Sequence, residues 1–463
     1  MNAAFPRRLL PSLSGLVIAA VASIAAFSVQ AATKIERVIS PGGIELWLVR
    51  EPSLPLIAID FSFNGGSSQV PADKAGLASM VTDLLDEGAG GLDARAFHEK
   101  VENYAISLGF NTSRDRVSGS LRTLSEHQDV AFDLLKMALT APRFDAAPVE
   151  RIRSQKMVGL RRAAMSPNEL ASRRWWEAAF PGHPYSVPVN GTIESLPGIT
   201  VDDMKGYVAR IFAKNTLKIG MVGNIDAATA GKIVDRIFGD LPAKANLVGV
   251  PDVAPKVGDG RVSVEIDVPQ SVVMVGGAGI ARNDPDFIPA YVLNHILGGG
   301  SFSSRLYREV REVRGLAYSV YSALMPLDRS ALFVAGTATR TDRAEQSLDV
   351  IVEEINRMAK TGPTAAELAD AKSFLKGSFA LRFDTSGKIA GQLVQMQIDD
   401  LGIDYIDKRN GLIDAVTLTD VQRVAKRLLD NKMLVAVAGK GQGAIAGGTT
   451  GVPAAAPAKR DGG

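Results

Sequence analysis

ITVDDMKGYVARIFAKNTLKIGMVG (residues 199–223) and VTLTDVQRVAKRLLDNKMLVAVAG (residues 416–439) follow one pattern. Each begins with Thr-x-x-Asp, at Thr200 and Thr417, continues with helical apolar spacing, and ends in an apolar, strand-like run closed by Gly. In such a start the Thr hydroxyl accepts a hydrogen bond from the third helical amide, and the acidic side chain accepts one from the Thr amide. Because Thr417 follows Thr200 by 217 residues, we predict two copies of one domain of about 200 residues.

Each copy mixes strands with helices. Residues 57–63 alternate like a half-buried strand, and residues 271–277 form a corresponding run in the second copy. The apolar residues that follow each run recur with helical spacing: Leu77, Met80, Val81, Leu84 and Leu85 in the first copy, and Ile288, Tyr291, Val292, His295 and Ile296 in the second. The predicted fold class is α+β, with each domain a β-sheet that has helices packed on it.

Changes in composition along the chain indicate the domain boundaries. The predicted order is a signal peptide over residues 1–31, a first domain over 32–241, a linker over 242–260, a second domain over 261–440 and a disordered tail over 441–463. The linker is rich in Pro and Gly, and the tail is rich in Gly, Ala, Pro and Thr, so neither has much apolar surface to bury.

The first 31 residues have the three parts of a secretory signal. Arg7 and Arg8 precede an apolar run from Gly15 to Phe27, and Ala31 ends a small-residue cleavage site. The run is shorter than the roughly 18 residues that span a bilayer, so a cleaved leader is preferred to an uncleaved anchor. The arginine pair leaves twin-arginine export open. The chain contains no Cys, and export without disulfides suits a bacterial periplasm.

The charge balance argues against nucleic acid as a partner. The chain has 52 basic and 50 acidic residues, and two of the basic residues are in the leader, which leaves 50 of each in the mature chain. Basic and acidic residues are also interleaved along the sequence, so no basic stripe for phosphate binding is expected.

The usual hydrolytic sites are not evident in the sequence. The four histidines, His98, His127, His183 and His295, are not at helical ligand spacing from one another, whereas a zinc site needs several ligands close together. There is no Gly-x-Ser-x-Gly elbow, although a serine nucleophile assembled from distant segments stays open. The run Gly298–Ser301 lacks the Lys-Ser/Thr of a P-loop.

GLASMVTDLLDEGA (residues 76–89) resembles the zinc-binding helix of the pitrilysin/insulinase family of metallopeptidases. In that family an inverted His-x-x-Glu-His motif holds zinc and supplies the general base. Here Ser79 and Asp83 stand at the histidine positions and Thr82 stands at the position of the base. The third ligand of the family, a Glu on a later helix, corresponds to the segment 158–160, which has no carboxylate. The resemblance therefore implies no metal in this chain.

The resemblance extends over residues 36–439 and implies a clamshell half made of two similar domains. Its most informative segment is REVRGLAYSVYS (residues 311–322), in which Arg311 and Tyr318 match the family's Arg/Tyr pair that positions the substrate backbone and stabilises the tetrahedral intermediate. The glycine run Gly298, Gly299 and Gly300 lies in a similar segment and is a candidate for close approach to an extended peptide. The alternative is structural: a salt-bridged helix face for Arg311 and an ordinary strand position for Tyr318.

Some members of this family divide the active site between two chains. The resemblance thus implies a zinc-less subunit of a heteromeric, exported metalloendopeptidase, with a homologous zinc-bearing subunit as its partner and a peptide as substrate. The zinc would belong to the partner subunit. The alternatives are a non-catalytic scaffold or peptide-binding subunit, and a chain that hydrolyses peptides alone.

Overall fold

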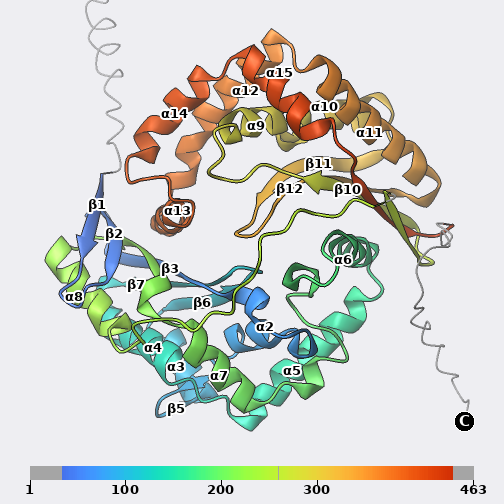
Figure 1. The fold of residues 1–463 in the computed structure, drawn as a ribbon. Helices are drawn as coiled ribbons and strands as arrows, with labels where there is room; N and C mark the ends of the chain where they lie inside the picture. The colour runs from blue at the N-terminus through green and yellow to red at the C-terminus, as the bar shows by residue number, and fades with distance from the viewer. Residues whose placement is uncertain (1–33, 259, 442–463) are drawn as a thin grey trace, which may run out of the picture. The chain divides into compact units, whose positions relative to one another are not determined.

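Two mixed β-sheets, one in each repeat, organise residues 34–258 and 260–441, which the computed structural model describes (Figure 1). The first sheet has the strand order β1-β2-β8-β3-β7-β6, and the second has the order β11-β12-β10-β13-β9. The strands of the first sheet are β1 (Ile35–Ile39), β2 (Glu45–Arg50), β3 (Leu56–Asn64), β6 (Ser107–Thr112), β7 (Arg116–Leu124) and β8 (Lys218–Gly223). Those of the second are β9 (Arg261–Glu265), β10 (Gln270–Ala278), β11 (Ala317–Pro326), β12 (Ala331–Arg340) and β13 (Leu434–Gly439).

Helices cover both sheets. The first repeat contains α2 (Leu77–Thr82), α3 (Ala94–Asn103), α4 (Gln128–Thr140), α5 (Ala146–Ala163), α6 (Pro167–Ala179), α7 (Val201–Ile211) and α8 (Ala227–Phe238), with a small hairpin of β4 (Gly88–Ala89) and β5 (Leu92–Asp93). The second contains α9 (Phe287–Asn294), α10 (Arg305–Tyr307), α11 (Ala344–Thr361), α12 (Ala365–Gly377), α13 (Ser386–Ile398), α14 (Tyr405–Ala415) and α15 (Leu418–Leu429). Two π-helical segments, His295–Gly299 and Arg308–Val313, flank α10. The predicted α+β class is confirmed.

The internal repeat is confirmed in detail. Thr200 caps α7 and Thr417 caps α15 with complete capping boxes, and each helix is followed by a strand, β8 or β13. Strand β8 pairs in parallel with β2 and antiparallel with β3. In the same way, β13 pairs in parallel with β9 and antiparallel with β10. The two sheets therefore share one topology, to which the first sheet adds β1.

The two repeats exchange a helix. In the first repeat, α6 packs its buried Trp175 and Trp176 against apolar residues of the second sheet, and the Trp175 indole donates a hydrogen bond to Leu434 O at 3.1 Å. In the second repeat, α13 packs Leu393 and its neighbours against the first sheet, and Gln397 Nε2 donates a hydrogen bond to Ile219 O at 2.9 Å. Each sheet is therefore completed by a helix from the other repeat.

The exchange explains why the prediction of a half-buried strand at residues 57–63 is wrong. Strand β3 is buried along nearly all of its length on both faces, and Ala58 lies in the cluster that α13 covers. The sequence pattern of β3 does not show this second cover, since it comes from a helix more than 300 residues later. Gly220 allows the close packing, because a Cβ atom there would lie 2.3 Å from Ala390 O of α13.

The segment between the repeats lies along both of them. Its described residues, 242–258 and 260, form neither helix nor strand. Pro251 O lies 3.0 Å from His183 Nε2, Lys256 N donates to Ala179 O, and Val253 N donates to Arg329 O. The predicted signal peptide lies outside the described residues, as does the predicted tail apart from Gly441.

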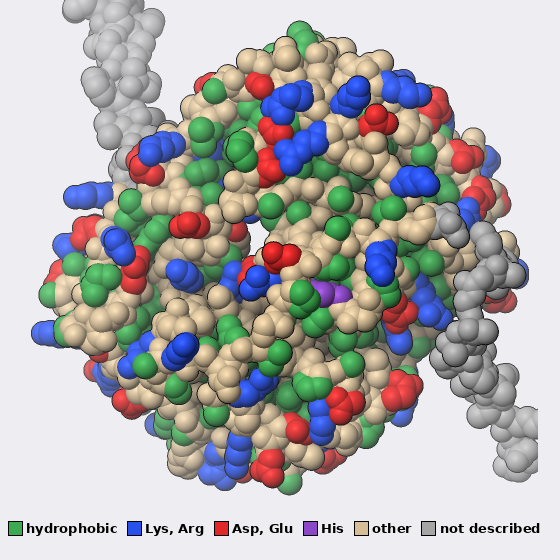
Figure 2. Space-filling view, in the orientation of Figure 1, with side chains coloured by type: hydrophobic (Ala, Val, Ile, Leu, Met, Phe, Trp, Pro, Cys, Tyr) green, Lys and Arg blue, Asp and Glu red, His purple; other side chains and the backbone are tan. Residues whose placement is uncertain are grey.

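The surface shows the interleaved charges that the sequence predicts, and the length and polarity of the helices bear on whether the chain spans a membrane. On the face drawn in Figure 2, Lys and Arg side chains are interspersed with Asp and Glu side chains. None of the helices in the described part of the chain has the length and apolar character that crossing a bilayer requires.

The helix exchange predicts the effect of truncating α13. Leu393→Ala removes a fully buried side chain between α13 and the first sheet and is expected to lower the free energy of unfolding by about 2–4 kcal/mol. Urea denaturation followed by circular dichroism measures this loss. Leu412→Ala, on the exposed side of α14, is the control and is expected to cost less than about 0.5 kcal/mol. Equal losses in the two variants would contradict the role of α13.

Candidate functional site

The three degenerate motif positions lie together at the end of α2. Ser79 and Thr82 are buried, and the Thr82 hydroxyl donates to Ser79 O at 3.1 Å. The Ser79 hydroxyl donates to Asn190 Oδ1 at 3.1 Å. Asp83 is the C-cap residue of the helix, and its side chain is partly exposed. These contacts are hydrogen bonds among neutral groups, with one carboxylate at the edge of the site.

Lys156 of α5 supplies the positive charge at this position. Its ammonium group lies 2.6 Å from Asp83 Oδ2 and donates a hydrogen bond to Ser79 Oγ, and its side chain is only 13% exposed. Lys156 lies just before the segment 158–160 of α5, to which the resemblance assigns the third zinc ligand. The sequence analysis missed Lys156, because only the folded arrangement brings it to Ser79 and Asp83.

This arrangement does not fit zinc. An ammonium group has no lone pair to donate to a metal and would repel a divalent cation from the same place. Among the described residues there is also no group of three His, Cys, Asp or Glu side chains placed to hold a metal ion. In this chain a salt bridge therefore stands where the family holds its metal.

Arg311 and Tyr318, seven residues apart, are brought together by the fold. Arg311 lies on the π-helical segment Arg308–Val313, and Tyr318 lies on β11, the edge strand of the second sheet. Arg311 Nη1 donates to Tyr318 O at 2.9 Å, and its guanidinium carbon lies 4.3 Å from the centroid of the Tyr318 ring. The Tyr318 side chain is 80% exposed. The pair thus presents a guanidinium and a phenol on an accessible surface.

Arg311 is separate from the ion pairs of its segment. Glu309 forms ion pairs with Arg308 and Arg314, and the hydrogen bonds from Arg314 and Arg308 hold the pKa of Glu309 below its ordinary value. No carboxylate of the described residues forms an ion pair with Arg311. The structural alternative, a salt-bridged helix face, therefore describes the neighbours of Arg311 but not Arg311 itself.

The glycine run lies at the end of the segment His295–Gly299. Gly298 is buried, and a Cβ atom there would lie 2.6 Å from Ser322 N of β11. Gly299 is exposed and packs closely against Asn294, and Gly300 is partly exposed and packs closely against His295. Close packing inside the protein is thus one reason for these glycines. Their role in substrate binding stays a prediction.

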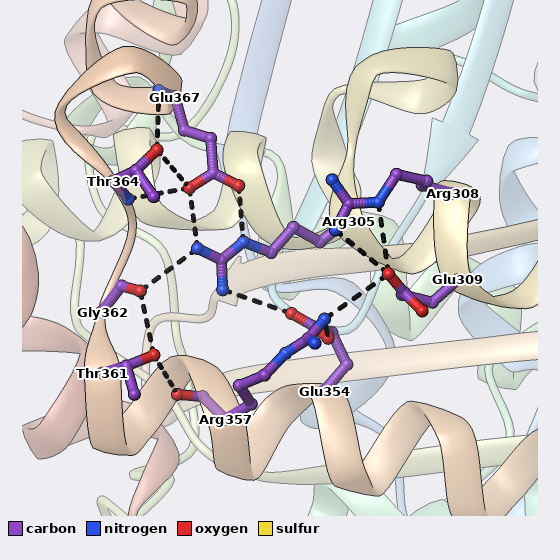
Figure 3. A network of polar contacts seen from close by, with 9 residues as sticks. All are labelled: Arg305, Arg308, Glu309, Glu354, Arg357, Thr361, Gly362, Thr364 and Glu367. Carbon is purple, nitrogen blue, oxygen red and sulfur yellow. Dashed lines mark hydrogen bonds and ion pairs between the residues drawn. The ribbon is translucent and has the colours of Figure 1, made fainter.

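A buried ion network fixes the helix that precedes Arg311 (Figure 3). Arg305 of α10 is 8% exposed and lies between two carboxylates. Its Nε and Nη2 atoms donate to Glu367 at 2.6 and 2.7 Å, and its Nη1 atom donates to Glu354 at 3.3 Å. Arg305 Nη2 also donates to Gly362 O at 3.2 Å. Because α10 continues directly into the segment that carries Arg311, the network holds that segment against α11 and α12.

Comparisons with known proteins agree with this geometry. Residues 48–193 match the sequence profile described as insulinase (peptidase family M16), and residues 198–375 match the profile described as the peptidase M16 inactive domain. The protein named non-peptidase homolog YmxG of Helicobacter pylori is 30% identical over 335 residues, which cover 72% of this chain and 77% of that protein. This chain belongs to peptidase family M16.

Further similarities cover almost the whole fold of this M16 chain. The uncharacterized zinc protease YmxG of Bacillus subtilis is 23% identical over 87% of this chain and 98% of its own length. The crystal structure of a peptidase M16 inactive domain from Pseudomonas fluorescens matches with a TM-score of 0.83 and 29% identity, covering 88% of this chain and 98% of that one. The predicted clamshell-type fold of two M16 domains is confirmed, and the match to the profile described as the M16 inactive domain fits the predicted lack of catalytic activity in this chain alone.

The Glu367 carboxyl makes the ion network sensitive to pH. Burial disfavours its ionisation, but hydrogen bonds from Arg305 and Thr364 outweigh burial and lower the pKa of Glu367 from 4.5 to about 2. A carboxyl with a lowered pKa stabilises the folded chain fully above its ordinary pKa, and this contribution is lost as the pH falls through the folded-state value.

Arg305→Gln is therefore expected to lower the free energy of unfolding by about 3–5 kcal/mol at neutral pH, because it removes the buried cation of Glu367 and leaves Glu354 with Arg357 alone. The loss relative to the native chain should shrink as the pH falls from 4.5 toward 2, where Glu367 becomes protonated. Denaturant titrations at several pH values measure this. Arg308→Gln, which removes an exposed ion pair, is the control and is expected to lower the free energy of unfolding by less than about 1 kcal/mol. A pH-independent difference would show that Glu367 does not carry the effect.

Lys156 is expected to oppose reconstruction of the metal site. The variant Ser79→His/Thr82→Glu/Asp83→His restores the motif but leaves the ammonium group in place. Adding Lys156→Ala should raise its zinc affinity at least about tenfold, because a nearby positive charge is removed. Equilibrium dialysis with metal analysis measures the zinc affinity of both variants. In the control, Lys205→Ala on the exposed side of α7 is added to the triple variant in place of Lys156→Ala. Equal affinities with and without Lys156 would contradict the prediction.

Proposed function

We propose that this chain is the zinc-less subunit of a heteromeric, exported metalloendopeptidase. In this proposal a homologous zinc-bearing M16 chain is the partner, and the two chains enclose an extended peptide. Arg311 and Tyr318 position the peptide and stabilise the tetrahedral intermediate at the partner's zinc site. The observation that carries the proposal is the accessible Arg311–Tyr318 pair, whose guanidinium has no ion pair among the described residues.

The chemistry of the pair suits this role. A tetrahedral intermediate develops negative charge on the former carbonyl oxygen, and a guanidinium and a phenol are both hydrogen-bond donors to such an oxygen. The carbonyl of Tyr318 and the aromatic rings of Tyr307 and Tyr318 hold the Arg311 guanidinium. Arg311 is thereby oriented without a carboxylate that would neutralise it.

Features of the sequence and of the Ser79 position support the proposed partner and location. The absence of a base at Thr82 and the salt bridge of Lys156 leave the hydrolytic step to another chain. The predicted signal peptide over residues 1–31 supports export to a periplasm, and the balanced charge supports a peptide or protein partner over nucleic acid.

A second candidate function is a non-catalytic scaffold or peptide-binding subunit. The name of the Helicobacter pylori relative, non-peptidase homolog, favours it for that protein, and Lys156 closes the metal position in this chain. In this case Tyr318 would serve as a docking residue, and Arg311 would support it.

The experiment combines this chain with a zinc-bearing M16 homologue from the same cell and measures peptide hydrolysis. Arg311→Ala is expected to reduce kcat about 100- to 1000-fold, and Tyr318→Phe about 10- to 100-fold, because each removes a donor to the developing charge. Arg314→Ala, which removes the ion pair with Glu309 and a hydrogen bond to Glu309 O, is the control and should leave kcat nearly unchanged. Size-exclusion chromatography checks that each complex stays intact. Unchanged turnover in intact complexes of Arg311→Ala and Tyr318→Phe would favour the scaffold.

A further inference from the structure

A pocket of about 740 Å³ lies in the first repeat, beside the Ser79–Lys156 position. Its walls are α5, α6 and the loop of residues 186–194, and Arg114 also lines it. The volume is in the range of sites that bind small molecules or several residues of a peptide. Lys156 and Asn190, which contact Ser79, belong to its lining. The Arg311–Tyr318 pair is not part of this pocket.

Arg114 is the polar group that distinguishes the pocket. Its guanidinium carbon lies 3.5 Å from the centroid of the Trp176 ring, and its Nε atom donates to Tyr185 O at 3.1 Å. Neither of its terminal Nη groups donates a hydrogen bond to any other described residue. Stacking and the Nε bond therefore hold the guanidinium plane in a fixed orientation while two donor groups stay free.

The charge of Arg114 is kept in spite of burial. Desolvation lowers the pKa of Arg114 to about 10, so the guanidinium is still positive at neutral pH. The neighbouring Asp115 accepts hydrogen bonds from the Tyr185 hydroxyl and from Asp328 N instead of pairing with Arg114. A partly buried charge without an ion pair is costly unless a ligand of opposite charge completes it.

The charges of the pocket are balanced, since the unpaired Arg114 and Arg162 are matched in number by two carboxylates, and Arg114 is distinguished by its free donors. Lys156 is paired with Asp83, and Arg173 is paired with Glu177. Arg162 lines the pocket and forms no ion pair with any described residue. The pocket also has two carboxylates, Glu169 and Glu194, and the pKa of Glu194 is lowered by a hydrogen bond from Thr192 and by Arg173. Neither carboxylate is within ion-pair distance of Arg114.

We propose that this pocket binds the carboxylate group of a peptide, with Arg114 as its bidentate donor. A planar guanidinium with two parallel N–H donors matches the geometry of a carboxylate. The apolar side chains of Leu160, Leu170 and Ile193 in the same pocket offer contact to the neighbouring residues of the peptide. The carboxylate is either the C-terminus of the peptide or an Asp or Glu side chain. The choice of a peptide as ligand rests on the proposed function.

The test uses this chain alone, without a partner, so that its failure is separate from failure of the Arg311–Tyr318 proposal. Isothermal titration calorimetry compares three acetylated peptides of Ala and Leu: one with a free C-terminus, one with an amidated C-terminus and an internal Glu, and one amidated with Gln in place of Glu. At least one carboxylate peptide is expected to bind about tenfold or more tightly than the neutral one, since charge-assisted bidentate bonds add this much. Which of the two binds identifies the source of the carboxylate.

Variants assign the effect to Arg114. Arg114→Gln is expected to remove the preference for the carboxylate peptide, and Arg114→Lys, which keeps the charge and the stem, should reduce it to an intermediate value. Arg161→Gln, next to the pocket on α5 but outside its lining, is the matched control and should bind like the native chain. Circular dichroism and urea denaturation confirm that each variant is folded, and Arg114→Lys carries the test if Arg114→Gln unfolds.

Three results would overturn the proposal. The first is equal affinity for the neutral and carboxylate peptides. The second is native affinity in both folded Arg114 variants. The third is that inorganic phosphate binds the chain with the same affinity as the carboxylate peptide. This would show a general anion site without peptide recognition.

Discussion

The reciprocal packing of α6 and α13 is the contact on which the rest of the structure depends. Each helix belongs to one repeat by sequence and covers the sheet of the other repeat. Burial of apolar side chains is the main favourable term in folding, and two of the four apolar clusters in the described residues cross between the repeats. Trp175 and Trp176 show the consequence for the sites. Trp175 fixes α6 to the second sheet through Leu434 O, and Trp176, the next residue, holds the guanidinium of Arg114. The wall of the pocket in the first repeat thus depends on the sheet of the second.

The emptied metal position shows how an M16 chain tolerates the loss of its metal. Removing a divalent cation leaves a polar, partly buried gap, and unpaired polar groups in such a gap are destabilising. Lys156 fills it with a single charge, which Asp83 balances, while Ser79 joins Asn190 in a hydrogen bond. The local fold therefore needs no metal. Its polar groups have partners within the chain.

Several features could be predicted from the sequence because the information is local. The capping boxes of Thr200 and Thr417 lie within four residues of sequence, and both form as predicted. The family motif singled out Arg311 and Tyr318, which are only seven residues apart, and the structure shows that they contact each other. Features that depend on distant segments were missed. The second cover of β3 comes from α13, the approach of Lys156 to Ser79 joins two helices, and the stacking of Arg114 on Trp176 joins a strand turn to α6. No periodicity or short motif records such contacts.

Arg305 and Arg311 lie six residues apart on one helical segment, and their environments differ in kind. Arg305 is buried between two carboxylates, where it links α10 to α11 and α12, so folding accounts for it fully. Arg311 has no such partner among the described residues, and Tyr318 beside it is mostly solvent-exposed. An exposed tyrosine and an arginine outside the ion pairs contribute little to the free energy of unfolding. The hydrogen bond and the stacking between them fix their orientation, but stability does not explain the exposure of the Tyr318 phenol. The proposed function gives this exposure a use, because a bound peptide or a second subunit would supply partners for the phenol and for the remaining guanidinium donors.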